Sequence, residues 1–302
     1  MVYTIAHMPI HKICTACIPT KSIWPLKDGT FRPKFYILYR KTTLIAKTSF
    51  SKVYNCVPTE VNDVQPGEWV VKIQNPLMND NNVMNELRIL RHLQDVSEVV
   101  SLVYAEVRLC ACYFVFEHIQ GLPLNKYMKT YPNTNKIHLV NRLLQAFKNI
   151  QSKHIVHRDI KFDNIMVEMV ESTSCPFRIR IIDFGLSVYQ SDLKHFTYNQ
   201  TVGTYQFQCP EMYMGYTYNG SCDTWSFGVM IYMLFFDKAP YIVKKNELQY
   251  CHMFRIVPEQ MKAINTKLNK IQTNALREWL QQILVLDKQT RPLLLDITKY
   301  RP

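Results

Sequence analysis

The sequence lacks a long hydrophobic run, because no stretch reaches the roughly 18 apolar residues that a membrane-spanning helix needs. The longest apolar run, FGVMIYMLFF at 227–236, is long enough only for a buried helix. The segment MVYTIAHMPIHK lacks the continuous apolar stretch of a signal peptide, since His7, Pro9 and His11 interrupt it. We therefore expect an intracellular protein without a membrane partner, in the cytoplasm, the nucleus or both.

Basic runs, repeats and low-complexity tracts are missing as well. The net charge is +12, yet no run of five Lys or Arg residues and no nucleic-acid motif occurs. The charge indicates a solvated basic surface; attraction to acidic protein, nucleic acid or anionic lipid is the alternative. The nine cysteines are odd in number and scattered through a chain large enough to fold without disulfides, which favours reduced thiols.

The first part of the chain after about residue 35 is rich in strand-forming segments. YILYRKTTLIA, KVYNCV and WVVKIQ are separated by turn residues, and SLVYAEVRL and CYFVFEHI follow later. Between these two groups, MNDNNVMNELRILRHL has apolar residues at helical spacing, with Asn and Asp as candidate caps. This region is predicted to be a sheet with one helix, ending near Ile119.

The second part is mostly helical in pattern. NKIHLVNRLLQAFKNIQSKHI has apolar residues at helical spacing, and DTWSFGVMIYMLFF is apolar on nearly every side. KLNKIQTNALREWLQQILVL is amphipathic. Together the two parts predict an α+β fold.

Two short motifs carry the chemistry. HRDIKFDN at 157–164 and IIDFG at 181–185 place Asp159, Lys161 and Asn164 ahead of Asp183 at a short turn. This set suits phosphoryl transfer from ATP. One carboxylate accepts the proton of a substrate hydroxyl, and an ammonium offsets charge on the transferred group. An amide and a second carboxylate bind magnesium.

The two motifs, in this order, resemble the catalytic loop and metal-binding turn of eukaryotic-type Ser/Thr protein kinases. The resemblance covers residues 37–302 and implies a bilobal fold, with a β-rich N-lobe at about 37–119 and a helical C-lobe at about 120–302. It implies that Asp159 and Lys161 are catalytic, that Asn164 and Asp183 bind Mg2+, that ATP donates the phosphoryl group, and that a protein Ser or Thr hydroxyl accepts it.

The resemblance also assigns a nucleotide pocket. Lys72 corresponds to the strand lysine that binds the α and β phosphates, and Glu86 to its helix partner. Glu117 and Ile119 are expected to bind adenine through their backbones. The other pocket positions are Ile45, Ala46, Val53, Val70 and Met166, with Phe116 as gatekeeper.

Further family positions follow the catalytic motifs. GTYQFQCPE at 203–211 resembles the segment that docks a peptide substrate, which disfavours a small-molecule kinase. Thr204, together with Lys161, favours Ser/Thr over Tyr specificity. Glu211 is expected to form a buried ion pair with Arg291, and Asp223 to anchor the backbone of the catalytic loop.

Arg158 corresponds to the arginine that often receives a phosphate from the activation segment. The candidate phosphorylation sites are Thr197, Tyr198 and Thr201. The position where the family most often has phosphothreonine falls near Gln200, so constitutive activity is the alternative.

Glycine is absent where the family pattern needs it most. The loop that should read GxGxxGxV is AKTSFSKV at 46–53, with Ala46, Thr48 and Ser51 in place of the glycines. Glycine allows backbone amides to approach phosphates and to adopt φ > 0. The substitutions favour weaker nucleotide binding, and they support the rival reading of a pseudokinase or scaffold. The eroded loop and compact form resemble divergent viral kinases, which would place the protein in an infected host cell.

Residues 1–36 are rich in Pro, Cys and Thr and form an expected N-terminal extension that packs on the N-lobe or mediates dimerisation. Zinc binding by His7, His11, Cys14 and Cys17 is the alternative, since these are ligand types that zinc accepts.

Overall fold

The structure is a computed structural model, and it describes residues 39–48, 51–59, 68–75, 80–107, 111–170, 176–194, 202–240, 262 and 264–302. The expected extension, with its dimerisation and zinc hypotheses, lies outside these residues, as do the candidate phosphorylation sites. The chain divides into two compact units. Unit 1 comprises the described residues up to Gln94 and Val100–Ile119, and unit 2 comprises Asp95–Val99 and Gln120–Pro302. The domain limits 1–36, 37–119 and 120–302 stay predictions.

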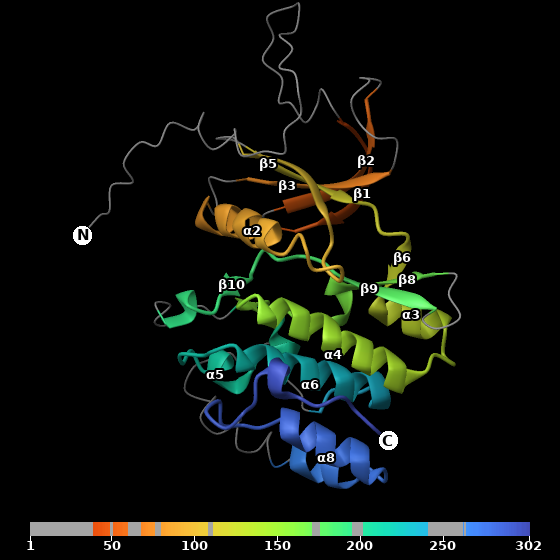
Figure 1. Ribbon diagram of the computed structural model, residues 1–302, viewed down its shortest axis with the longest axis vertical. Coiled ribbons are helices and arrows are strands. Elements are labelled where there is room, and N and C mark those ends of the chain that lie inside the picture. Colours follow the sequence, from red (N-terminus) through yellow and green to blue (C-terminus); the bar gives the residue numbers. More distant parts are fainter. Residues whose placement is uncertain are drawn as a thin grey trace, which may run out of the picture. The chain divides into compact units, whose positions relative to one another are not determined.

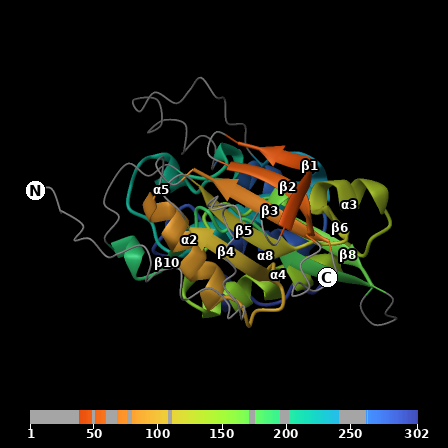
Figure 2. The ribbon, with the colours of Figure 1, turned by 90° about the horizontal axis from the view of Figure 1, so that it is seen from above.

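Unit 1 is a five-stranded antiparallel sheet with one helix (Figure 1). The strand order is β1-β2-β3-β5-β4, so β3 lies at the centre. The elements are β1 (Tyr39–Lys47), β2 (Ser51–Pro58), β3 (Trp69–Gln74), α2 (Asp80–His92), β4 (Leu102–Val107) and β5 (Cys112–Glu117). Figure 2 shows the strands side by side, with α2 next to β4.

The two faces of this sheet have different roles. One face carries a buried cluster formed by Tyr39, Cys56, Val71, Tyr104, Tyr113 and Val115. The opposite face carries Lys72, because successive side chains along a strand point to opposite faces. Val53 lies directly across from Lys72, and Ala46 directly across from Val53. The register therefore places three predicted nucleotide-pocket residues in one row.

Unit 2 combines short strands with several helices. Its first elements are β6 (Gly121–Pro123), α3 (Leu124–Thr130), α4 (Lys136–Ser152), β7 (Ile155–Val156), η4 (Phe162–Asn164), β8 (Ile165–Met169), β9 (Phe177–Ile181) and β10 (Val188–Tyr189). The later elements are η5 (Asp192–Lys194), η6 (Tyr205–Phe207), α5 (Pro210–Tyr213), α6 (Ser221–Phe236), α8 (Asn274–Ile283) and η8 (Leu294–Asp296). The strands form two small antiparallel sheets, β6-β8-β9 and β10-β7.

The core of unit 2 forms between α4, α6 and α8, which Figure 1 shows stacked in this order. The side chain of Asn135 caps α4 by accepting a hydrogen bond from the His138 amide at 3.0 Å. Helix α6 is buried on nearly every side, as its apolar sequence predicts. A Cβ at Gly228 would lie 2.6 Å from the Ile283 side chain, so glycine permits α8 to pack closely against α6.

The fold class predicted from the sequence is confirmed: an N-terminal antiparallel sheet with one helix precedes a mostly helical region. The amphipathic stretch KLNKIQTNALREWLQQILVL is not one continuous helix. Its helix α8 covers only Asn274–Ile283. The chain turns before it at Ile271, whose amide donates a hydrogen bond to the Leu268 carbonyl. No helix in the described part of the chain is both long and apolar enough to cross a bilayer.

Candidate active site

The carboxylate of Asp159 is the centre of a hydrogen-bond network in unit 2. Its Oδ1 accepts from the amide and the hydroxyl of Thr204, at 3.0 and 2.9 Å. Its Oδ2 accepts from Lys161 Nζ at 2.7 Å and from Asn164 Nδ2 at 3.0 Å. Lys161 also donates to the Thr204 hydroxyl at 2.9 Å. The structure thus brings together four residues from two separate segments, and the Asp159 side chain is 8% exposed.

The backbone just before Asp159 is held by a buried carboxylate. Asp223, near the start of α6, accepts hydrogen bonds from the amides of His157 and Arg158 at 2.7 and 2.8 Å. Burial raises the pKa of Asp223, while the nearby His157 ring and these amide hydrogen bonds oppose the rise. The contact predicted for Asp223 is therefore present.

Arg158 adopts φ = +66°, a left-handed conformation that is unusual for a residue with a side chain. Gly203 approaches it closely from the other segment. A Cβ on Gly203 would lie 2.5 Å from the Arg158 carbonyl oxygen, and Gly203 itself has φ = +87°. Only glycine fits this contact, which brings Thr204 within hydrogen-bonding distance of Asp159.

The two predicted metal ligands lie on either side of the β8–β9 hairpin. Asn164 is buried at the end of η4, and its amide nitrogen donates to the backbone and side chain of Asp159. Because the nitrogen faces Asp159, the side-chain oxygen is the atom suited to a hard cation. Asp183 is exposed at a turn with φ = +63°. Among the described residues, no group of three or more His, Cys, Asp or Glu could hold a metal ion.

In unit 1, Lys72 on β3 forms an ion pair with Glu86 on α2, with 2.8 Å between Nζ and Oε1. Glu86 is 1% exposed, and its other oxygen accepts from Gln74 Nε2 at 2.7 Å. Gln74 lies two residues after Lys72 on the same strand, so both side chains reach α2 from one face of the sheet. The Lys72–Glu86 contact expected from the sequence is present.

The remaining pocket positions are distributed over both units. Val70 lies directly across from Phe116 on β5, and Ile45 lies at a register shift in β1, where it is 52% exposed. The amide of Glu117 donates to the Ser101 carbonyl, and the Glu117 carboxylate accepts from the Ser101 amide. Ile119 is buried at the end of unit 1, whereas Met166 lies on β8 in unit 2. The roles given to these residues stay predictions.

The turn between β1 and β2 is closed by its own hydroxyl groups. The amide of Thr48 donates to the Ser51 carbonyl at 2.8 Å, and the amide of Ser51 donates to Thr48 Oγ1 at 3.0 Å. The two hydroxyls lie 2.9 Å apart. Two amides that the family pattern would direct at phosphates are therefore bonded within the turn.

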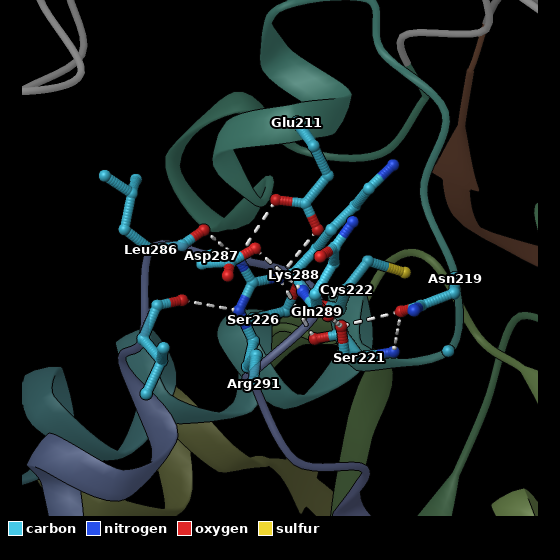
Figure 3. A network of polar contacts seen from close by, with 12 residues as sticks. Glu211, Asn219, Ser221, Cys222, Ser226, Leu286, Asp287, Lys288, Gln289 and Arg291 are labelled. Atoms are coloured by element: carbon cyan, nitrogen blue, oxygen red, sulfur yellow. Dashed lines mark hydrogen bonds and ion pairs between the residues drawn. The ribbon is translucent and has the colours of Figure 1, made fainter.

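Glu211 on α5 and Arg291 form the buried ion pair predicted from the sequence (Figure 3). The pair is bidentate, with distances of 2.6 and 3.0 Å. Arg291 also donates to the carbonyls of Val285 and Leu286, and its guanidinium lies 5.1 Å from the centre of the Trp225 ring. Burial by itself would lower the pKa of Arg291, but the Glu211 carboxylate raises it above its usual value.

Sequence reasoning missed three contributors: Gln74, Gly203 and Tyr218. The position of Gln74, two residues from Lys72 on a strand, was a signal that could have identified it. Gly203 begins the recognised docking segment, but its close approach to Arg158 is a tertiary contact. Tyr218, whose hydroxyl accepts from Arg158, has no signal in the sequence.

Comparisons with known proteins agree with this geometry. A family model for the protein kinase domain matches residues 39–301. Serine/threonine-protein kinase 33 of Bos taurus is 25% identical over 260 residues, which cover 78% of this chain and 51% of that protein. Serine/threonine-protein kinase unc-51 of Caenorhabditis elegans is 27% identical over 270 residues, or 86% of this chain and 29% of that protein.

Serine/threonine-protein kinase ULK1 of Homo sapiens is 26% identical over 210 residues, which cover 67% of this chain and 20% of that protein. The chain thus spans about half the length, or less, of these relatives. All three are animal proteins, so the viral affinity expected from the sequence is not supported.

Proposed function

We propose that this chain, which belongs to the protein kinase family, transfers the γ-phosphoryl group of ATP to Ser or Thr hydroxyls of protein substrates with the help of magnesium. The observation that carries the proposal is the arrangement around Asp159, where Lys161, Asn164 and Thr204 all donate to one carboxylate. Such an arrangement fixes the direction of the carboxylate without substrate.

Asp159 is the proposed base. Both of its oxygens accept hydrogen bonds, so the carboxylate is oriented before a hydroxyl arrives and little reorganisation is needed. Its task is to position the substrate hydroxyl and to accept the proton late in the transfer. Lys161, 21% exposed at its side chain, is proposed to offset negative charge on the transferred phosphoryl group.

Asn164 and Asp183 are the proposed magnesium ligands. Their side chains supply hard oxygens, and magnesium typically takes one or two protein carboxylates or amides together with phosphate oxygens and water. Among the residues that the structure describes, no cluster of three His, Cys, Asp or Glu side chains could hold a metal, so Asn164 and Asp183 fit magnesium better than a closed structural metal site. A bound magnesium ion would neutralise negative charge on the phosphates.

Lys72 is proposed to bind the α and β phosphates of ATP. The ion pair with Glu86 holds its ammonium in place, and Gln74 fixes the other oxygen of that carboxylate. Ala46, Val53 and Val70 lie on the same face of the sheet and would contact the base, together with Ile45, Met166 and the backbones of Glu117 and Ile119.

Ser/Thr specificity is the finer part of the proposal. Thr204 bridges Lys161 and Asp159 through one hydroxyl, which accepts from the first and donates to the second. The names of the three relatives reported above contain serine/threonine-protein kinase, and their identities of 25–27% support the same specificity here.

A second candidate, a kinase-fold scaffold, is favoured by the β1–β2 turn. The Thr48 and Ser51 amides are bonded within that turn, which removes two of the phosphate contacts expected in the family. This reading predicts weak nucleotide binding and no transfer.

The test combines binding and transfer. Thermal-shift titration with Mg-ATP measures nucleotide binding, and a peptide array with labelled ATP measures transfer to Ser, Thr and Tyr. We expect label on Ser and Thr peptides with the wild-type chain and none with Asp159→Asn. Binding without transfer by the wild type would favour the scaffold, and label on Tyr peptides alone would contradict the specificity.

A further inference from the structure

The guanidinium of Arg158 is held by partners from two segments of unit 2. Its Nε donates to the Leu186 carbonyl at 2.5 Å, and its Nη1 donates to the Tyr218 hydroxyl at 2.8 Å. Leu186 follows the turn that contains Asp183, and Tyr218 lies in the loop between α5 and α6. Arg158 is 7% exposed. One side chain thus connects the catalytic loop, the predicted metal-binding turn and the loop before α6.

The contacts of the Arg158 side chain matter because Arg158 directly precedes Asp159 in the catalytic loop. Its left-handed backbone is a strained conformation, and such strain persists only when the surroundings hold it. Asp223 holds its amide, and Gly203 packs against its carbonyl. Tyr218 and Leu186 hold the far end of its side chain. Because Asp159 is the next residue, any movement of Arg158 would displace the proposed base.

The Tyr218 hydroxyl can accept a hydrogen bond from the Arg158 guanidinium when no phosphate group is present. Burial raises the pKa of Tyr218, although the neighbouring Arg158 opposes the rise, so the phenol stays protonated at neutral pH. Its oxygen can accept from Arg158 while its proton is used elsewhere. The residue is half-buried, which lowers competition from water for this hydrogen bond.

We propose that the Tyr218 hydroxyl is a built-in acceptor for Arg158, which keeps the catalytic loop assembled without a phosphate on the activation segment. Tyr218 is then a positioning residue that acts through Arg158 on Asp159. The contact coexists with the complete Asp159 network, so it supports the assembled arrangement and does not block it. This inference rests on the proposed kinase function.

The first experiment compares Tyr218→Phe with Tyr216→Phe, which makes the same chemical change at an exposed side chain two residues earlier. Both variants and the wild type are treated with phosphatase, and mass spectrometry verifies that no phosphate remains. We expect the wild type to stay active. We expect Tyr218→Phe to lose roughly ten-fold in kcat with the KM for ATP within about two-fold, since it removes a hydrogen bond to a charged group and changes none of the residues proposed to bind ATP.

A second comparison tests whether Tyr218 acts through Arg158. In an Arg158→Met background, Tyr218→Phe should have no further effect on kcat, because the shared contact is already lost. The inference is overturned if Tyr218→Phe keeps or exceeds wild-type kcat, if the two changes are additive, or if phosphatase treatment abolishes wild-type activity.

Hydrogen exchange separates this inference from the proposed function. If the wild type transfers no phosphate, the kinase proposal fails, but the contact can still be judged. Peptides covering 157–164 and 184–189 should then exchange faster in Tyr218→Phe than in Tyr216→Phe. Equal exchange in the two variants would show that Tyr218 does not hold Arg158.

Discussion

The catalytic loop of unit 2 and the β1–β2 turn of unit 1 differ in how far they follow the family pattern. In the catalytic loop Lys161, Asn164 and Thr204 all donate hydrogen bonds to Asp159, and Asp223 holds the backbone before it. In the β1–β2 turn the glycines are replaced, and Thr48 and Ser51 bond to each other. The catalytic loop keeps the residues of the family pattern, whereas in the turn the amides of Thr48 and Ser51 are hydrogen-bonded internally.

The difference follows from how each region would act. Proton transfer and metal binding need a few atoms at defined positions, so a shift of about 1 Å there is costly. Under the proposed function, nucleotide binding has several contributors, among them Lys72 and the apolar face of the sheet. The loss of one contributor is therefore tolerated better in unit 1 than in unit 2.

The largest effect is expected at the centre of the unit 2 network. Asp159→Asn and Asp183→Asn should each lower kcat by roughly 10²–10⁴-fold, because one removes the proposed base and the other a proposed metal ligand. Phosphate transfer to a peptide measures this, with circular dichroism to show that the variants stay folded. Asp296→Asn, at an exposed position in η8, is the matched control. Turnover within a few-fold of the wild type would contradict these roles.

The second effect concerns the stability of unit 2. Arg291→Ala leaves Glu211 buried without its partner and should lower the free energy of unfolding by about 3–5 kcal/mol. Urea denaturation measures the change. Arg301→Ala, at an exposed position, should be nearly neutral. If both variants unfold at the same urea concentration, the ion pair does not contribute to stability.

The third effect tests unit 1. Because the Thr48 and Ser51 amides are hydrogen-bonded within the β1–β2 turn, nucleotide binding should depend strongly on Lys72. Lys72→Ala should weaken ATP affinity about ten-fold or more, equivalent to at least about 1.4 kcal/mol. Isothermal titration with Mg-ATP measures it, and Lys129→Ala on the exposed side of α3 is the control. An unchanged Kd would show that the phosphates are bound elsewhere.

The smallest effect is expected when glycine is restored in the β1–β2 turn, so that this turn follows the family pattern as the catalytic loop does. Thr48→Gly with Ser51→Gly removes the hydroxyls that close the turn and releases the Ser51 amide. We expect the KM for ATP to fall about five-fold, equivalent to about 1 kcal/mol, with a smaller change in kcat. Thr48→Ser with Ser51→Thr keeps both hydroxyls and should leave KM unchanged. A KM that stays the same or rises in the glycine variant would mean that the native turn already serves the nucleotide.

Much of the candidate site was predictable because its residues are close in sequence. HRDIKFDN fixes the spacing of Asp159, Lys161 and Asn164, and the alternation along β3 fixes the face that Lys72 shares with Val70. The pairings Lys72–Glu86 and Glu211–Arg291 followed from the family resemblance, and both contacts are present. The closure of the β1–β2 turn was not predicted, since Thr and Ser hydroxyls have several possible backbone partners.

The sequence by itself determined the fold class, the order of strands and helices, and the residue types that could transfer a phosphoryl group. Periodicity and short motifs are local properties, so they can be read along the chain. The family resemblance pointed to Asp223 as an anchor of the catalytic loop, but only the tertiary structure decided that Gly203 and Tyr218 also hold it. Gly203 packs against the carbonyl of Arg158, next to Thr204, which bonds to Asp159 from 45 residues further along the chain. The Tyr218 hydroxyl accepts a hydrogen bond from the Arg158 guanidinium, which is 60 residues away in the sequence. Contacts of this kind depend on the packing of the whole unit, and no local pattern encodes them.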